Sequence, residues 1–163
     1  MSLNAVIYCD CIEKNRVTIP HPLPNLLFID ETGAPNISST DPLEIEAHDR
    51  WESLQPCQHE HFWLVEHWMG NTSLIGSIRA LMEQFSSDPA REYPTLWSKV
   101  IYDGSHSGDF LTSDAVRQLS DEVDRLNRMK NLLSTDTAHL VEFLRKLEHL
   151  IQVSLSVDKP ILF

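Results

Sequence analysis

Two apolar stripes with helical spacing run through the C-terminal third of the chain. Within each stripe the apolar residues recur every three or four positions, which is the period of one helix face. The first stripe comprises Val116, Leu119, Val123, Leu126 and Leu133, and the second comprises Leu140, Leu144, Leu147, Ile151 and Leu155. The polar link at residues 134–137 is short enough to force the two helices into an antiparallel pair. The sequence therefore predicts a C-terminal helical hairpin.

Two further helices are predicted earlier in the chain. One begins at Asp41, where an N-cap aspartate precedes Pro42 at the first helical position, and stops at Pro56. Its predicted core face consists of Leu43, Ala47, Trp51 and Leu54. The other begins at Asn71 or Thr72 and ends near residue 86. Its predicted core face consists of Leu74, Ile75, Ile78, Leu81, Met82 and Phe85.

Short runs rich in β-branched and aromatic residues predict a small sheet. Residues 4–10 form the first predicted strand, and residues 26–29 and 36–38 form a hairpin around a turn that contains glycine and proline. Residues 96–102 favour a strand, with a helix as the alternative left open. The tail at residues 159–163 is too apolar to be left in solvent, and we expect it to pack back as a strand.

These segments predict an α+β fold in a single domain over residues 1–163. The domain is expected to be dominated by helices, with a small sheet from the first forty residues and residues 96–102 packed against about four helices. A chain of 163 residues, 42% of them hydrophobic, can bury a sizeable core without disulfide bonds.

Acidic residues dominate the charge of the chain and gather in one region. The chain has 24 acidic and 13 basic side chains, which gives a formal net charge of −11. Between residues 30 and 66 the only base is Arg50, and the acids are Asp30, Glu31, Asp41, Glu44, Glu46, Asp49, Glu52, Glu60 and Glu66. Such a surface repels a phosphate backbone and attracts a basic protein, so we expect a basic protein partner and no nucleic acid. Glu44, Asp49 and Glu52 are the candidate contact residues, and the alternative is a solvated surface that only aids solubility.

Three cysteines do not make a disulfide framework. Cys9 and Cys11 are one residue apart, which is too close for an ordinary bridge in an extended chain, and Cys57 would then have no partner. Reduced thiols are typical of a reducing compartment. The first residues lack the basic segment of a secretory signal, and no run approaches the ~20 apolar residues of a membrane helix. We therefore predict a cytoplasmic protein that does not enter a membrane.

Residues 57–61 (CQHEH) contain the sharpest candidate site. In an extended chain Cys57, His59 and His61 share one face, and so do Cys9 and Cys11 on the first predicted strand. If the two segments are neighbours, their thiolate and imidazole donors converge on a tetrahedral zinc site, which supports hydrolase activity only if one coordination position stays open. Structural zinc sites usually separate ligands by about two to four residues, unlike these pairs. The alternative is that the thiols are small core residues.

A catalytic thiol is a further alternative. Cys57 would be the nucleophile, and folding would have to bring a histidine within hydrogen-bond reach as the base. The candidate bases are His59, His61, His67 and His106. No family-specific sequence surrounds Cys57, so we expect a binding protein rather than an enzyme.

Two remaining segments show no catalytic pattern. Residues 104–109 (GSHSGD) match neither a Walker loop nor a dinucleotide-binding motif, and an ordinary connector is predicted there. Trp63 and Trp68 have apolar neighbours and are predicted to be core residues.

Four short motifs carry a resemblance to known proteins. Residues 8–11 (YCDC), 57–60 (CQHE), 105–109 (SHSGD) and 159–163 (KPILF) resemble a group of small, acidic bacterial proteins of uncharacterised activity. The resemblance implies a bacterial, cytoplasmic protein, and analogy with immunity partners of secreted toxins implies a non-enzymatic binding role. An immunity or regulatory factor that uses an acidic face and no cofactor is thus the leading expectation. The alternative is a zinc-binding protein whose ligands come from Cys9, Cys11, Cys57, His59 and His61.

Overall fold

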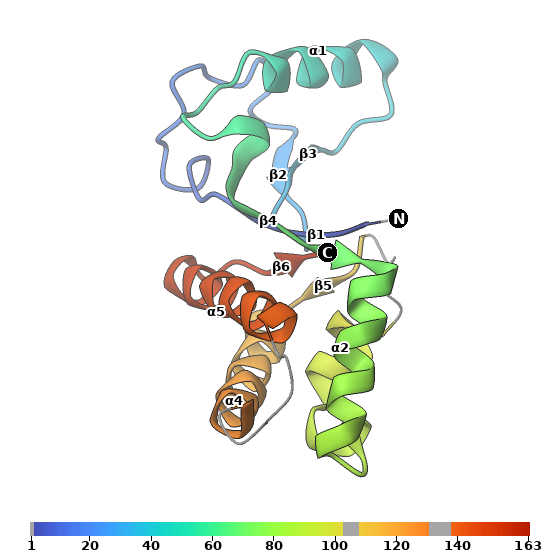
Figure 1. The fold of residues 1–163 in the computed structure, drawn as a ribbon. Helices are drawn as coiled ribbons and strands as arrows, with labels where there is room; N and C mark the ends of the chain where they lie inside the picture. The colour runs from blue at the N-terminus through green and yellow to red at the C-terminus, as the bar shows by residue number, and fades with distance from the viewer. Residues whose placement is uncertain (1, 103–107, 131–137) are drawn as a thin grey trace.

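A four-stranded antiparallel sheet crosses the middle of the molecule (Figure 1). The computed structural model describes residues 2–102, 108–130 and 138–163, with the side chain of residue 130 excepted. The strands, in spatial order, are β4 (Trp63–Asn71), β1 (Ser2–Tyr8), β6 (Ile161–Leu162) and β5 (Phe110–Leu111). β1 and β4 pair along their length, from Ser2 opposite Asn71 to Tyr8 opposite Trp63. Because β6 pairs with both β1 and β5, the two ends of the chain meet in this sheet.

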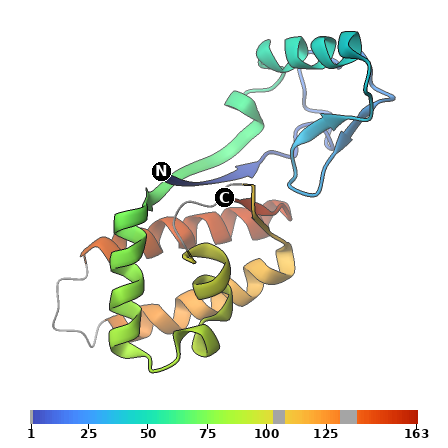
Figure 2. The same ribbon diagram turned by 90° about the vertical axis from the view of Figure 1, so that its right-hand side faces the viewer.

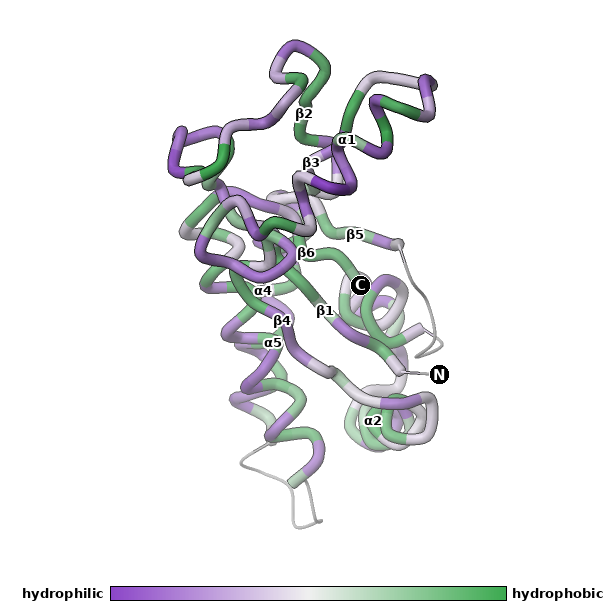
Figure 3. Tube along the Cα trace, turned by 90° about the horizontal axis from the view of Figure 1, so that it is seen from above, coloured by the Kyte–Doolittle hydropathy of each residue, from purple (hydrophilic) through white to green (hydrophobic). Residues whose placement is uncertain are grey.

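Helices cover one side of this sheet (Figures 1 and 2). They are α2 (Thr72–Phe85), α3 (Pro89–Glu92), the single π-helical turn η2 (Leu96–Val100), α4 (Ser113–Lys130) and α5 (Ala138–Val157). Apolar and polar residues alternate along α5 with the period of a helix (Figure 3). α4 and α5 pack against each other, which confirms the helix pair of the predicted hairpin. The predicted polar link at residues 134–137 and Leu133 of the first predicted stripe lie outside the described residues.

The larger of two hydrophobic clusters lies between the sheet and these helices. It contains Leu3, Ala5 and Ile7 of β1, the predicted stripe of α2 and the apolar faces of α4 and α5. β1, β4, β5 and β6 with the helices α2 to α5 are called the helical body below. Asn71 begins α2 as predicted, because its side-chain oxygen accepts the Leu74 N–H at 2.9 Å. The confirmed fold class is therefore α+β, with most of the buried apolar residues in the helical body.

The remaining residues, 9–62, form a smaller unit on the other side of β1 and β4 (Figure 2). This unit, called the N-terminal module below, contains the hairpin of β2 (Leu27–Ile29) and β3 (Pro35–Ile37), the helix α1 (Pro42–Ser53) and the 3-10 turn η1 (Glu60–Phe62). Its buried cluster consists of Cys9, Cys11, Trp51, Cys57 and Phe62. Three of these five buried residues are therefore cysteines.

The predicted core face of α1 is correct for Trp51 and wrong for Leu43 and Leu54. Leu43 and Leu54 are 75% and 57% exposed, whereas His48 and Trp51 are buried. The Trp51 indole N–H donates to the Ile19 carbonyl at 2.9 Å, which fixes the face that turns inward. The start of α1 is as predicted, with the Asp41 carboxylate capping the helix.

The strand favoured for residues 96–102 is also wrong, because this segment begins with the helical turn η2. The buried carboxylate of Glu122 on α4 accepts the backbone N–H groups of Thr95 at 3.0 Å and Leu96 at 2.8 Å. Those two donors are free at the start of a helix, so a residue distant in sequence stabilises the turn. The sheet instead takes its remaining strands from β4, from β5 and from the tail, where β6 confirms the expected strand.

Trp68 was expected in the core, and the structure places it at the surface. It is 49% exposed on β4, so only Trp63 of the predicted tryptophan pair is partly buried. The ammonium group of Lys146 on α5 lies 5.3 Å from the centre of the Trp68 ring. Trp68 is therefore a surface residue that contacts α5 through its ring face.

Candidate metal centre

The structure brings two short segments together beside the end of β1. Cys9 and Cys11 lie in the turn that follows β1, and Cys57 and His59 lie between α1 and η1. Backbone hydrogen bonds join the segments: the Cys9 N–H donates to the Phe62 carbonyl at 2.7 Å. A second bond, also of 2.7 Å, runs from the backbone N–H of residue 18 to the carbonyl of residue 56. The two Cys-containing pairs are thus fixed relative to each other by backbone contacts.

Charged groups hold the turn that carries Cys9 and Cys11. The Asp10 carboxylate is buried and forms ion pairs with Lys14 and Arg16. The backbone N–H of Arg16 donates to the Cys11 carbonyl at 2.7 Å. These bonds curl the chain so that both thiols, although one residue apart, reach the same point.

Four donor atoms meet within 4.8 Å of one another, namely the three cysteine sulfurs and one nitrogen of His59. Cys9 Sγ lies 3.9 Å from Cys57 Sγ, and His59 Nδ1 lies 3.4 Å from Cys11 Sγ and 3.8 Å from Cys57 Sγ. A zinc ion with bonds of about 2.3 Å to sulfur and about 2.05 Å to nitrogen, at tetrahedral angles, separates two sulfurs by about 3.8 Å and a sulfur from the nitrogen by about 3.6 Å. These three separations are close to the tetrahedral values, and the other three pairs of donor atoms lie no more than 4.8 Å apart.

Burial keeps the Cys9 and Cys11 thiols neutral in the absence of a cation. The three cysteines are buried and unbridged. Loss of hydration raises the pKa of the Cys9 thiol to about 12, and it raises the pKa of the Cys11 thiol as well. Since a thiolate is the form that binds metal, a cation would have to displace these protons on binding.

The outer side of His59 has a polar neighbour. With Nδ1 facing the sulfurs, Nε2 lies 3.5 Å from the side-chain amide of Gln58. Rotation of that amide would present its oxygen to an Nε2 hydrogen, and such a bond fixes the tautomer that leaves Nδ1 free to bind metal.

His61 lies outside this cluster. The chain is not extended over residues 57–61, because η1 turns it and His61 adopts the left-handed backbone conformation with φ 50°. The His61 ring lies 5.0 Å from the Trp63 ring, and its Nε2 is 3.7 Å from the Glu60 carboxylate. The expectation that strand alternation unites the donors is wrong, and two turns bring four of the five together instead.

The acidic candidates are spread around α1. Glu44 accepts a hydrogen bond from the Ser39 hydroxyl, Asp49 is exposed, and Glu52 lies 3.7 Å from Nε2 of His48. At 100° per residue, Glu44 and Asp49 are about 140° apart on the helix, with Glu52 between them. They do not form one narrow stripe, although all three lie on the same element of the N-terminal module.

A buried histidine pair was missed by the sequence analysis. Nε2 of His21 lies 3.0 Å from Nδ1 of His48, and Nδ1 of His21 accepts the Leu23 N–H at 3.0 Å. That acceptor role places the His21 hydrogen on Nε2, from which it is donated to His48. Burial lowers the pKa of both histidines. The position of His48 on α1, three residues before the buried Trp51, is the only signal in the sequence for this pair.

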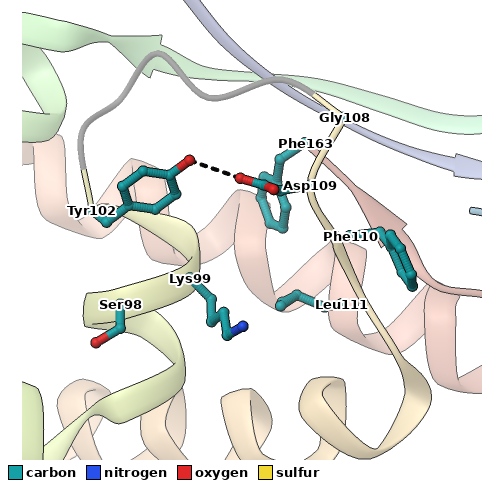
Figure 4. Close-up of a pocket in the computed structure, with 8 residues that line it drawn as sticks. All are labelled: Ser98, Lys99, Tyr102, Gly108, Asp109, Phe110, Leu111 and Phe163. Atoms are coloured by element: carbon teal, nitrogen blue, oxygen red, sulfur yellow. Dashed lines mark hydrogen bonds between the residues drawn. The ribbon is translucent and has the colours of Figure 1, made fainter.

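A cavity of about 260 Å³ lies in the helical body beside η2 and β5 (Figure 4). Lys99 and Leu111 line it, and the Tyr102 hydroxyl donates to the Asp109 carboxylate at 2.7 Å across it. Of the predicted connector at residues 104–109 only Gly108 and Asp109 are described, and the candidate base His106 lies outside the described residues. In the described part of the chain, no cysteine lines this cavity.

Comparisons with known proteins add no assignment. No protein-family model, no curated protein and no solved structure matches this chain. Among the described residues no helix is both long and apolar enough to cross a membrane. The resemblance based on four short motifs therefore stays a prediction, and the functional argument rests on the geometry of the molecule.

Proposed function

We propose that this protein binds one zinc ion through Cys9, Cys11, Cys57 and His59, and that the ion holds the N-terminal module together. The observation that carries the proposal is the mutual separation of the four donor atoms, all within 4.8 Å. Three sulfurs and one imidazole nitrogen form a donor set preferred by zinc, whereas calcium and magnesium prefer oxygen ligands.

The proposed role of the metal is structural. A catalytic zinc keeps one position for water or substrate, and here four protein donors would fill a tetrahedral shell. The hydrolase activity considered from the sequence is therefore not part of the proposal. A stabilising role suits the module, because it has one helix of three turns, two strands of three residues and a five-residue buried cluster.

Metal analysis tests this proposal directly. Untagged full-length protein purified without chelator should contain about one zinc per chain, as the four-ligand site requires. His59→Ala should lose most of the zinc, whereas the matched variant His61→Ala, two residues away, should retain it. Replacement by cobalt should give the visible spectrum of a tetrahedral thiolate site. A metal-free wild type with three free thiols in denaturant, or equal zinc loss in the two variants, would overturn the proposal.

A second proposed function is the binding of a basic protein partner by the α1 surface, in the manner of an immunity or regulatory factor. The supporting observation is that Leu43 on this helix and Leu54 at its C-cap are exposed among acidic side chains. Exposed apolar residues rimmed by charge are typical of protein interfaces. Because this surface is acidic, the partner should carry basic side chains around an apolar centre.

Charge reversal tests the second function. A partner captured from a bacterial lysate and then purified should bind the wild type and lose affinity for the Glu44→Lys, Asp49→Lys, Glu52→Lys triple variant. The control reverses three exposed acids of α4 and should leave binding unchanged. The control positions are Asp114, Asp121 and Asp124. Equal binding by the wild type and the α1 variant would remove α1 as the interface.

A further inference from the structure

A second cavity, of about 420 Å³, opens where the N-terminal module meets the sheet. It lies between the end of β1, the start of β4, the end of α1 and the turn of the β2–β3 hairpin. Its lining consists of Tyr8, Ala34, Pro35, Glu52, His61 and Trp63. The zinc ligands proposed above are absent from this lining, so the cavity is a separate place in the molecule.

Aromatic rings form much of the cavity wall. Tyr8 and Trp63 are direct partners in the antiparallel pairing of β1 and β4, so their side chains lie next to each other on one face of the sheet. The His61 ring adds a third surface, 5.0 Å from the Trp63 ring and tilted by 49°. The faces of aromatic rings carry partial negative charge, which attracts organic cations.

A single carboxylate completes the wall. Glu52 lies in the last turn of α1, with its side chain 41% exposed and 3.7 Å from the imidazole of His48. No lysine or arginine is among the residues that line the cavity. Burial is the main reason why the pKa of Tyr8 and the pKa of Glu52 are raised. The nearby carboxylate of Asp30 raises the pKa of Tyr8 further, and that of Asp49 raises the pKa of Glu52 further. The electrostatic surroundings of the cavity are therefore negative.

The backbone fixes one side of the cavity firmly. His61 and Phe62 are consecutive residues with positive φ, 50° and 61°, a conformation that side-chain-bearing residues seldom adopt. Phe62 is buried against Trp51, with ring centres 5.3 Å apart, and its carbonyl accepts the Cys9 N–H. These contacts hold the turn that places His61 beside Trp63.

We propose that this cavity binds an organic cation, an ammonium or guanidinium group, between the rings of Tyr8 and Trp63 with Glu52 as its counter-ion. The chemistry fits a lysine or arginine side chain of a protein as well as a free alkylammonium compound. In the first case the cavity anchors the partner of the α1 surface and rests on the second function proposed above. In the second case it is independent of that function.

Binding by charged and neutral probes of equal shape tests the cavity in the wild type. Zinc-supplied full-length protein is titrated by NMR at a pH of about 8, where most imidazoles are neutral. The probes are choline with its neutral analogue 3,3-dimethylbutan-1-ol, and N-acetylarginine amide with its neutral analogue N-acetylcitrulline amide. We expect the indole signal of Trp63 to shift with the charged members only. Equal shifts with the neutral members, or no shift with any probe, overturn the proposal.

Matched variants then test the role of the carboxylate. Glu52→Gln should weaken the binding of the charged probes by about 5- to 30-fold, since it removes the counter-ion and leaves the rings. Glu46→Gln makes the same change at an exposed site on the same helix and should leave binding unchanged. Trp63→Phe keeps a ring and should weaken binding less than Glu52→Gln does. Equal affinities of the two glutamine variants would contradict the assignment of Glu52.

The probes also separate the two sources of the cation. Tighter binding of a blocked Gly-Arg-Gly peptide than of choline assigns the cavity to a protein side chain, and the reverse order assigns it to a free cation. The Glu44→Lys, Asp49→Lys variant leaves Glu52 in place and tests the α1 surface separately. If this variant no longer binds the partner and the wild type binds none of the cations, the α1 surface is supported as the interface and the cavity proposal is overturned.

Discussion

The helical body and the N-terminal module are stabilised in different ways. The body buries Leu, Ile, Val, Met and Phe side chains from the sheet and from α2, η2, α4 and α5. The module has five residues in its buried cluster, and three of them are thiols that lie within reach of His59. A unit of this size rarely gains more than about 3–5 kcal/mol from its core alone, and natural small domains add disulfides or a metal. We propose that this chain combines a region with a self-sufficient core and a unit that depends on a bound ion.

Loss of the metal should separate the two regions most clearly. In Cys57→Ser we expect backbone amides across residues 9–62 to lose protection in hydrogen exchange, while α2, α4 and α5 keep theirs. Structural zinc contributes about 10–16 kcal/mol of apparent binding energy in zinc-finger peptides, which exceeds what the core of the module can supply. Hydrogen exchange read by mass spectrometry measures this. A chelator added to the wild type is the control and should give the same pattern.

Uniform protection in Cys57→Ser and in the chelated wild type would show that both regions depend on their apolar cores. Loss of protection in the helices as well would show that the two regions unfold as one unit. Either result would contradict the proposal that the helical body and the N-terminal module are stabilised in different ways.

A cavity in the helical body should have the next largest effect. Phe143 of α5 is buried in the larger cluster, so Phe143→Ala should cost about 3–5 kcal/mol in the free energy of unfolding. Its zinc content per folded chain should stay the same. Val141→Ala changes an exposed residue two positions earlier and should cost less than about 0.5 kcal/mol. Denaturant unfolding measures both, and equal losses would contradict the assignment of Phe143 to the core.

The hydrogen bonds from η2 to Glu122 should have a smaller effect confined to the helical body. Glu122→Gln puts a neutral amide where a carboxylate accepts two backbone N–H groups, and should cost about 1–3 kcal/mol. Asp121→Asn, the same chemical change at the exposed neighbouring position, is the control and should be nearly neutral. Urea unfolding compares the two variants. A cost for Asp121→Asn as large as for Glu122→Gln would argue against the cap.

The histidine pair should give the module the smallest of these effects, a dependence on pH. Burial lowers the pKa of His21 and of His48 below 6.5 in the folded protein. As the pH falls below 6.5 the unfolded chain binds protons that the folded module does not, so stability is constant above this pH and decreases below it. Each unit of pKa shift is worth about 1.4 kcal/mol, which bounds the effect.

The variant His48→Gln isolates this effect from the acid sensitivity of a zinc site. Its melting temperature should decrease less between neutral and mildly acidic pH than that of the wild type, because one buried titrating group is gone. His139→Gln, at an exposed position on α5, should follow the wild type. Identical pH profiles for all three proteins would exclude a contribution from the buried pair.

Local patterns account for the parts of the fold that were predicted correctly. The stripe and cap of α2, the start of α1 and the two long C-terminal helices follow from spacing and from capping residues close in sequence. The strand at the start of the chain follows from β-branched residues, and the strand at its end from an apolar tail. The errors and omissions lie where a distant group decides, as when Glu122 caps η2 or His21 pairs with the buried His48.

The candidate metal site was likewise predictable only in part. The residue types and the two short Cys-containing motifs are visible in the sequence, and four of the five expected ligands do converge. The reason for their convergence was not predictable, because it lies in two turns and in backbone hydrogen bonds between residues 53 and 38 positions apart. His61 shows the consequence, since one left-handed residue moves it from the proposed zinc site to the wall of a cavity.

The sequence by itself determined the four long helices of this chain and which residue types are available for chemistry, because helix periodicity and capping depend on residues within a few positions of each other. The tertiary structure alone decided which face of α1 is buried, which donors meet, and where the aromatic cavity opens. Those outcomes depend on contacts between segments far apart in sequence, and only the packed chain brings their partners within reach.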